Sequence, residues 1–146
     1  MIAAPLVAVL LGTVAPLVHF QSPSGNINCI GQRAAYGEPA FVSCLVRKST
    51  WPASVTPHKP ANCDLDFDPH TIGMGNRRVT VGSCRGDIGP LCGLSNDKCS
   101  TLAYGHSVTM GPIRCTSTTA GVTCRYTTGP RVGFLIARER YVVYRS

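Results

Sequence analysis

Eight cysteines, all between Cys29 and Cys124, constrain the fold of this chain more than any other feature. An even number of cysteines in an exported chain indicates a disulfide framework, because oxidising compartments form such bonds and keep them. Structural zinc is the alternative, but zinc sites usually pair their ligands at C-x-x-C or H-x-x-x-H spacing. Neither spacing occurs here. We therefore expect four disulfides, with no metal ion and no other cofactor.

Pairing each cysteine with its nearest neighbour in the sequence is the simplest arrangement, since every such pair brackets residues that favour turns. It predicts the disulfides Cys29–Cys44, Cys63–Cys84, Cys92–Cys99 and Cys115–Cys124. Loops this short contribute about 2–3 kcal/mol each to stability in the chain-entropy estimate. Other connectivities stay open, because spacing alone does not determine them. With all cysteines paired, no free thiol is left to act as a nucleophile.

The first 18 residues differ in composition from the rest of the chain. No charged side chain occurs between Ile2 and Val18, and Thr13 is the one strongly polar residue. An apolar run of this length is typical of a signal peptide or a membrane anchor. We predict that residues 1–18 form an apolar signal or uncleaved anchor helix. Residues 19–146 then form a single domain that is secreted or held at the cell envelope, with membrane contact only through the N-terminal segment.

The remainder of the chain consists of short segments rich in β-branched and aromatic residues, separated by Gly, Pro, Ser and Asn. Clear examples are residues 41–46, 79–81, 122–126, 133–136 and 141–144. No window of a dozen residues carries the periodicity of an amphipathic helix. We predict an all-β, disulfide-stapled domain of short antiparallel strands and hairpins, with residues 141–144 as a closing edge strand.

A weak internal repeat supports this prediction. In each half of the domain, an Ile lies two residues before one cysteine and a Val lies two residues before the next. The residues are Ile27, Cys29, Val42 and Cys44 in the first half, and Ile113, Cys115, Val122 and Cys124 in the second. Because side chains alternate along a strand, each Ile and Val shares a face with its cysteine. Each half therefore looks like a hairpin with an apolar inner face bridged by a cystine.

Several short motifs resemble a domain family of unknown function found in secreted actinobacterial, especially mycobacterial, proteins. The opening Phe-Gln-Ser-Pro-Ser-Gly-Asn-Ile-Asn-Cys at residues 20–29 is the most specific of them. The others are Val42-Ser43-Cys44, Trp51-Pro52, Tyr104-Gly105, residues 121–124, residues 129–134 and Tyr141. The resemblance implies an exported, cystine-bearing β domain and carries over no catalytic residue. Pro130-Arg131-Val132 departs from it, standing in place of a shorter glycine turn.

The net charge of +7 comes from eleven arginines and three lysines against seven acidic residues. Outside the cell, a net positive charge favours binding to anionic envelope polymers, anionic lipid headgroups or acidic extracellular proteins. The cations are scattered, with adjacent pairs only at Arg47-Lys48 and Arg77-Arg78. Because there is no basic run and no alternation of arginine with aromatic residues, we do not expect a nucleic-acid partner.

The acidic segment 64–68 is the strongest candidate for a metal-binding or catalytic site. Its alternation predicts a half-buried strand with solvated aspartates and with Leu65 and Phe67 in the core. It does not fit a calcium loop, since Pro69 takes the position of the required glycine. An alternative hydrolytic site could combine Asp66, His70, Asp87 and His106. No serine has the Gly-x-Ser-x-Gly context of a nucleophile elbow.

These patterns favour a secreted, non-catalytic domain that binds an envelope or extracellular partner through a basic surface. A small secreted hydrolase that uses Asp and His side chains is the first alternative. A secreted inhibitor or toxin-like module that presents the Cys92–Cys99 loop is the second. Trp51 could serve as an exposed binding residue, but a lone tryptophan more often covers the core of a domain.

Overall fold

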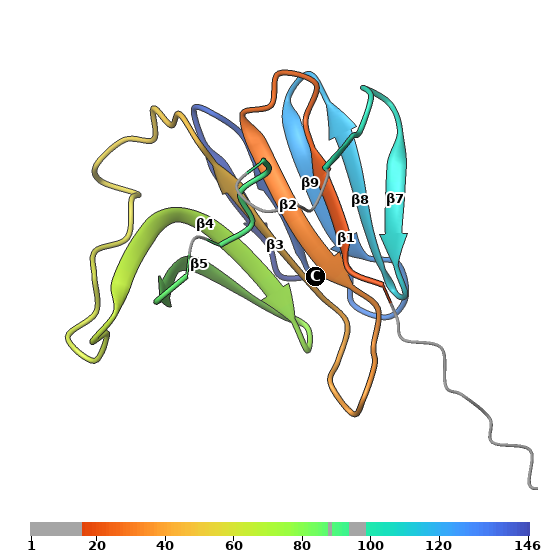
Figure 1. Cartoon of the computed structure of the whole chain (residues 1–146), viewed down its shortest axis with the longest axis horizontal. Helices are drawn as coiled ribbons and strands as arrows, with labels where there is room; N and C mark the ends of the chain where they lie inside the picture. Colours follow the sequence, from red (N-terminus) through yellow and green to blue (C-terminus); the bar gives the residue numbers. More distant parts are fainter. Residues whose placement is uncertain (1–15, 88, 94–98) are drawn as a thin grey trace, which may run out of the picture.

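The computed structural model describes residues 16–87, 89–93 and 99–146, which form eleven β-strands in two sheets (Figure 1). The six-stranded sheet, in the order β5-β4-β3-β2-β1-β6, consists of β1 (Val18–Gln21), β2 (Ile27–Gln32), β3 (Phe41–Val46), β4 (Asp66–Gly75), β5 (Arg78–Arg85) and β6 (Ser100–Thr101). The five-stranded sheet, in the order β11-β10-β9-β8-β7, consists of β7 (Ser107–Met110), β8 (Ile113–Thr118), β9 (Gly121–Tyr126), β10 (Gly133–Ile136) and β11 (Tyr141–Tyr144). Neighbouring strands are antiparallel except β6, which runs parallel to β1. The all-β prediction is confirmed, and no helix occurs among the described residues.

Most of the predicted leader, residues 1–15, lies outside the described residues, and so does the helix expected there. Pro16 and Leu17 are exposed, and β1 begins at Val18, one residue before the expected start of the domain. Within the ranges that the structure describes, no helix is long and apolar enough to cross a membrane.

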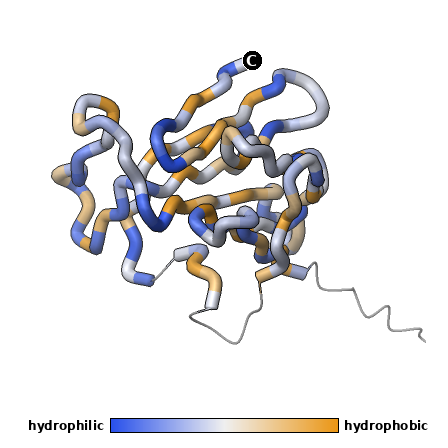
Figure 2. The backbone as a smooth tube through the Cα atoms, turned by 90° about the horizontal axis from the view of Figure 1, so that it is seen from above, coloured by the Kyte–Doolittle hydropathy of each residue, from blue (hydrophilic) through white to orange (hydrophobic). Residues whose placement is uncertain are grey.

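The two sheets pack face to face around one apolar core. Seen from above, hydrophobic stretches of the strands run through the middle of the molecule, and hydrophilic turns lie at its margin (Figure 2). The Ile, Val and Cys residues of the internal repeat all belong to this core, and none is more than 5% exposed. Cys29 lies directly opposite Cys44 in the first sheet, and Cys115 lies opposite Cys124 in the second. The predicted inner faces of the two hairpins are therefore correct.

The four disulfides join the pairs that nearest-neighbour pairing predicts. Those of β2–β3 and β8–β9 are completely buried, with Cα–Cα distances of 4.1 Å and 4.0 Å. Cys63–Cys84 ties the loop before β4 to β5, and Cys92–Cys99 closes the loop that follows β5. Four such bonds indicate an oxidising, extracytoplasmic environment, because thiols in the cytosol are kept reduced.

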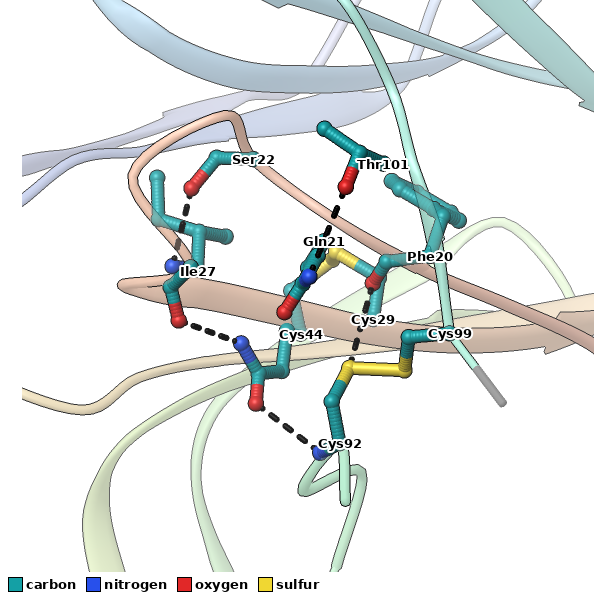
Figure 3. The surroundings of a disulfide bond; sticks show 11 residues. Phe20, Gln21, Ser22, Ile27, Cys29, Cys44, Cys92, Cys99 and Thr101 are labelled. Atoms are coloured by element: carbon teal, nitrogen blue, oxygen red, sulfur yellow. Dashed lines mark hydrogen bonds between the residues drawn. A yellow bond between two sulfur atoms is a disulfide. The ribbon is translucent and has the colours of Figure 1, made fainter. Parts of the chain in front are cut away.

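The Cys92–Cys99 disulfide lies beside β1 and β2 of the first sheet (Figure 3). The Cys92 backbone N–H donates to Oδ1 of Asn28, whose amide group in turn donates to the Gly25 carbonyl. Asn28 is completely buried and alternates with the inward-facing Cys29, so Cys92 lies on the outer side of β2. The Gln21 amide donates to Thr101 Oγ1 beside it. The Cys92 N–H thereby satisfies the buried Asn28 side chain, which would otherwise destabilise the sheet.

The prediction for the acidic segment is partly wrong. Leu65 is 52% exposed and lies before β4, which begins at Asp66. The β4–β5 register shifts between Asp68 and Ile72, where Pro69 has no N–H to donate. The Asp68 carboxylate fills this gap by accepting from the His70 backbone N–H and from Thr71 Oγ1. The alternation expected of a regular strand is therefore lost over this segment.

Trp51 covers the core, as a lone tryptophan more often does, and is 7% exposed. Its ring contacts His70 and Tyr141, and its Nε1 donates to the Ala137 carbonyl at 2.8 Å. Tyr141 begins β11, which pairs with β10 alone and is the predicted edge strand. The segment after β3 is thus fastened to the second sheet.

Arg77 joins the sheets at the opposite end of the molecule, in the β4–β5 turn. Asn76 and Arg77 have φ angles of 49° and 57°, in the left-handed region that side chains other than glycine rarely adopt. The guanidinium of Arg77 lies 4.5 Å from the Tyr126 ring centroid and donates to the carbonyls of Thr128 and Pro130. Its backbone N–H donates to the Tyr126 hydroxyl. These contacts with β9 and the loop after it offset the strain of the turn.

We expect Arg77→Ala to lower the free energy of unfolding by about 1–2 kcal/mol, because it removes the cation–π contact and both side-chain hydrogen bonds. Urea denaturation of the oxidised protein measures the change. Arg78→Ala is the matched control: Arg78 is exposed and has no side-chain partner among the described residues, so a change within about 0.5 kcal/mol is expected. Equal losses in the two variants would show that Arg77 does not link the sheets.

Candidate functional site

A pocket of about 680 Å³ lies at the end of the sandwich that carries the β1–β2 turn. Figure 1 shows this turn at the top of the molecule. Segments from both sheets line it: the β1–β2 turn, the end of β3, the β8–β9 turn and the β10–β11 turn. The loop between β6 and β7 adds Tyr104. The pocket is therefore assembled only when the two sheets pack together.

Three cations stand on the rim of this pocket, which we call the basic pocket. Arg47 and Lys48 follow β3, and Arg138 follows β10. All three are exposed, and none of their side chains has a hydrogen-bond or ion-pair partner among the described residues. Glu139 is the one acidic residue that lines the pocket. The net positive charge of the rim favours an anionic ligand.

Asn26 fixes the position of Arg47 and Lys48. Its side-chain Oδ1 accepts from the Lys48 backbone N–H at 2.8 Å, and its Nδ2 donates to the Lys48 carbonyl at 3.1 Å. Its own carbonyl accepts from the Arg47 backbone N–H. The end of β3 is thus bonded to the β1–β2 turn as a strand would be, and the two basic side chains leave it at a defined place.

Ser22 and Gly25 shape the turn that carries Asn26. The Ser22 hydroxyl accepts from the Ile27 N–H, and the Ser22 carbonyl accepts from the Gly25 N–H. Gly25 has a φ of 75°, which glycine adopts without strain. Residues 22–26 therefore form the turn and also line one side of the pocket.

Arg138 is positioned from the other sheet by the segment that leads to Trp51. The Thr50 backbone N–H donates to the Arg138 carbonyl at 2.8 Å, next to the bond from Trp51 to Ala137. The Ala137 N–H donates to the Arg140 carbonyl and closes the turn. Hydrogen bonds between the sheets therefore fix where the backbone of Arg138 lies relative to Lys48.

Tyr104 supplies an aromatic ring beside these charges. It lies in a turn in which the His106 N–H donates to the Ala103 carbonyl, and Gly105 has a φ of 81°. The Gly105 N–H donates to the Ser117 carbonyl, which holds the turn against the end of β8. Tyr104 is 51% exposed, so its side chain is available to a ligand in the pocket.

Cations, hydroxyl groups and an exposed ring together suit a ligand that is anionic and rich in hydroxyls. Thr119 brings a hydroxyl group to the lining, and so do Ser22, Ser24 and Thr118, whose hydroxyls also hydrogen-bond within their own turns. A tyrosine offers both an apolar face and a polar edge to such a ligand. Non-covalent binding is the chemistry that these side chains can supply.

The residues of the alternative hydrolytic site are not brought together. Asp66 and His70 lie on β4, with His70 packed edge-on against Trp51. Asp87 is exposed after β5, where it accepts from the Gly89 N–H and lies 3.9 Å from Arg85. His106 is exposed before β7 in the other sheet. None of the four lines the basic pocket.

Metal-ligating side chains are also dispersed. Over residues 16–87, 89–93 and 99–146, no three His, Cys, Asp or Glu side chains are placed to hold a metal ion. Sequence reasoning singled out the Arg47-Lys48 pair but not its convergence with Arg138 and Tyr104. No local signal could have found that convergence, because the residues come from distant turns.

The comparison with family models identifies the chain. The model for Family of unknown function (DUF6636) matches residues 2–144. The chain belongs to the DUF6636 family. This agrees with the resemblance to a family of unknown function that the sequence motifs indicate. Neither the curated proteins nor the solved structures gave a match. For this DUF6636 domain, the site itself must therefore carry the functional argument.

We expect Asn26→Ala to release the end of β3 from the β1–β2 turn. Loss of two hydrogen bonds should lower stability by about 1–2 kcal/mol and speed hydrogen exchange at the Lys48 amide. Two-dimensional NMR of the exchanging protein measures both effects. Asn62→Ala is the control, since Asn62 is exposed and has no side-chain partner within the described ranges. Unchanged protection of the Lys48 amide in Asn26→Ala would contradict the assigned role.

Proposed function

We propose that this chain is a non-catalytic binding domain, secreted or held at the cell envelope, whose basic pocket binds an acidic carbohydrate. The observation that carries the proposal is the convergence of Arg47, Lys48 and Arg138 on one rim, without partners among the described residues. Because these three cations form no ion pair with the described residues, they are available to bind an anionic ligand.

The surroundings of the cations favour a carbohydrate over a simple ion. Hydroxyl side chains and backbone groups of three turns line the pocket and can hydrogen-bond to sugar hydroxyls. Tyr104 adds a ring face on which a sugar ring can pack. A second hollow beside the β2–β3 loop lacks this chemistry, because Glu38 is the one charged residue in its lining.

The disulfides support an extracytoplasmic setting for such binding. Four covalent links restrict the unfolded chain and protect a small domain outside the cell. Asp66, His70, Asp87 and His106 all lie outside the basic pocket, which favours binding over hydrolysis there, since a general acid and base must lie within reach of the substrate bond.

Calorimetric titration with oligogalacturonate, whose every sugar carries a carboxylate, tests the proposal. We expect binding that weakens with added salt, and no binding of the methyl-esterified, neutral oligomer. The triple variant Arg47→Ala, Lys48→Ala, Arg138→Ala should lose at least about tenfold in affinity, because each charge-assisted hydrogen bond contributes about 1 kcal/mol or more.

A second triple variant controls for net charge. Arg33→Ala, Lys59→Ala, Arg78→Ala removes the same number of cations from exposed positions outside the pocket and should bind the oligomer as the wild type does. Equal losses in the two triple variants would reject the pocket as the site. Chain cleavage of the oligomer would overturn the non-catalytic assignment, and binding only to anionic vesicles or to a protein would replace the carbohydrate.

A further inference from the structure

The net positive charge of this chain is concentrated in its last third, which contains the five-stranded sheet. Between Ser100 and Ser146, a range that includes the whole five-stranded sheet, there are six arginines and one acidic residue, Glu139. All other acidic residues precede Ser100. An anionic polymer that approaches the domain is therefore attracted toward the second sheet.

The outer face of that sheet presents hydroxyl groups and an unpaired arginine. On β8, Arg114, Thr116 and Thr118 alternate with the buried Ile113, Cys115 and Ser117, so all three point outward. The neighbouring strands add Ser107, Thr109 and Thr123 to the same face, by their register with β8. None of these outward residues is acidic, and Arg114 has no side-chain partner among the residues that the structure describes.

Arg125 lies directly opposite Arg114 but is engaged elsewhere. Its guanidinium lies 4.3 Å from the centroid of the Tyr144 ring and donates to the carbonyls of Arg131 and Ser146. Gly133 lies close against this part of β9, since a Cβ there would lie 2.2 Å from the Cys124 carbonyl oxygen and 2.5 Å from the Arg125 Cγ. The Arg125 side chain therefore stabilises the fold, whereas the Arg114 side chain is available to contact a ligand.

The outward strip of β8 leads directly into the basic pocket. Thr118, at the end of β8, belongs both to this strip and to the lining of the pocket. Arg114 is four residues earlier, about 13 Å away along the strand. β8 and its turn toward the pocket are visible in Figure 1. One continuous path thus joins the three cations of the pocket to a fourth.

We infer that the outer face of β8 and β9 is an extension of the binding site, so that the ligand is an internal stretch of a linear acidic polysaccharide. Resting on the proposed function, this inference assigns Arg114 a second, separate charge contact beyond the pocket. The threonines between the two contacts, Thr116 and Thr123, would lie under the uncharged part of the chain. A short oligomer fills the pocket alone, and a longer one also reaches Arg114.

Titration with oligogalacturonates of increasing length tests this inference. Wild-type affinity should rise by about five- to tenfold once the oligomer is long enough to reach Arg114, the effect of one charge-assisted contact. In Arg114→Ala that rise should disappear, while the affinity for the shortest bound oligomer stays unchanged. Arg78→Ala, which removes an exposed arginine from the other sheet, should keep the rise.

The outcomes separate this inference from the proposed function. Affinity that depends on the pocket cations but not on length, or a rise retained in Arg114→Ala, overturns the extended site and leaves the pocket assignment intact. An equal loss in Arg114→Ala at every length, or in Arg78→Ala alike, also overturns it, since the effect is then one of general charge. Failure of every oligomer to bind overturns both.

Discussion

Two buried cystines, one in the middle of each sheet, are the constraint on which the rest of the structure depends. Each joins directly opposite residues of a central hairpin, Cys29 to Cys44 and Cys115 to Cys124. Because each bond fixes which residues face each other, it also fixes which side chains point inward. The flanking Ile and Val residues then point into one core. The opposite face of β2 contacts Cys92, and the opposite face of β8 carries Arg114, Thr116 and Thr118. The covalent links thus set the register from which both surfaces follow.

Besides the shared apolar core, hydrogen bonds join the two sheets at both ends of the sandwich. Arg77 links the β4–β5 turn to β9 at one end, and Trp51 with Thr50 links the segment after β3 to the β10–β11 turn at the other. The basic pocket lies at the second end. Its shape therefore depends on hydrogen bonds made by backbone groups and by Asn26, and its charge depends on side chains that make none of those bonds. In the proposed site, the fold and the recognition of a ligand therefore depend on different atoms of the same residues.

The sequence was sufficient for features that depend on local spacing. The two-residue spacing of Ile27 and Cys29, and of Val42 and Cys44, predicted the inner face, and the turn signals between cysteines predicted which would pair. It was insufficient where a regular strand is interrupted, as at Asp68 and Pro69, because a register shift leaves no mark in the pattern of apolar residues. It also could not predict the pocket, since Asn26, Lys48 and Arg138 meet only through the packing of two sheets.

The hydrogen bonds of the β1–β2 turn have a consequence for how sequences of related chains should be compared. Ser22, Gly25, Asn26 and Asn28 are all engaged within the protein, so their persistence in a relative would report that the same backbone is preserved. The side chains of the three rim cations make no such bonds, so substitutions at these positions should leave the stability of the fold unchanged. Relatives that share the opening motif can therefore differ in the ligand that they bind. We expect such differences to appear as substitutions at positions 47, 48 and 138.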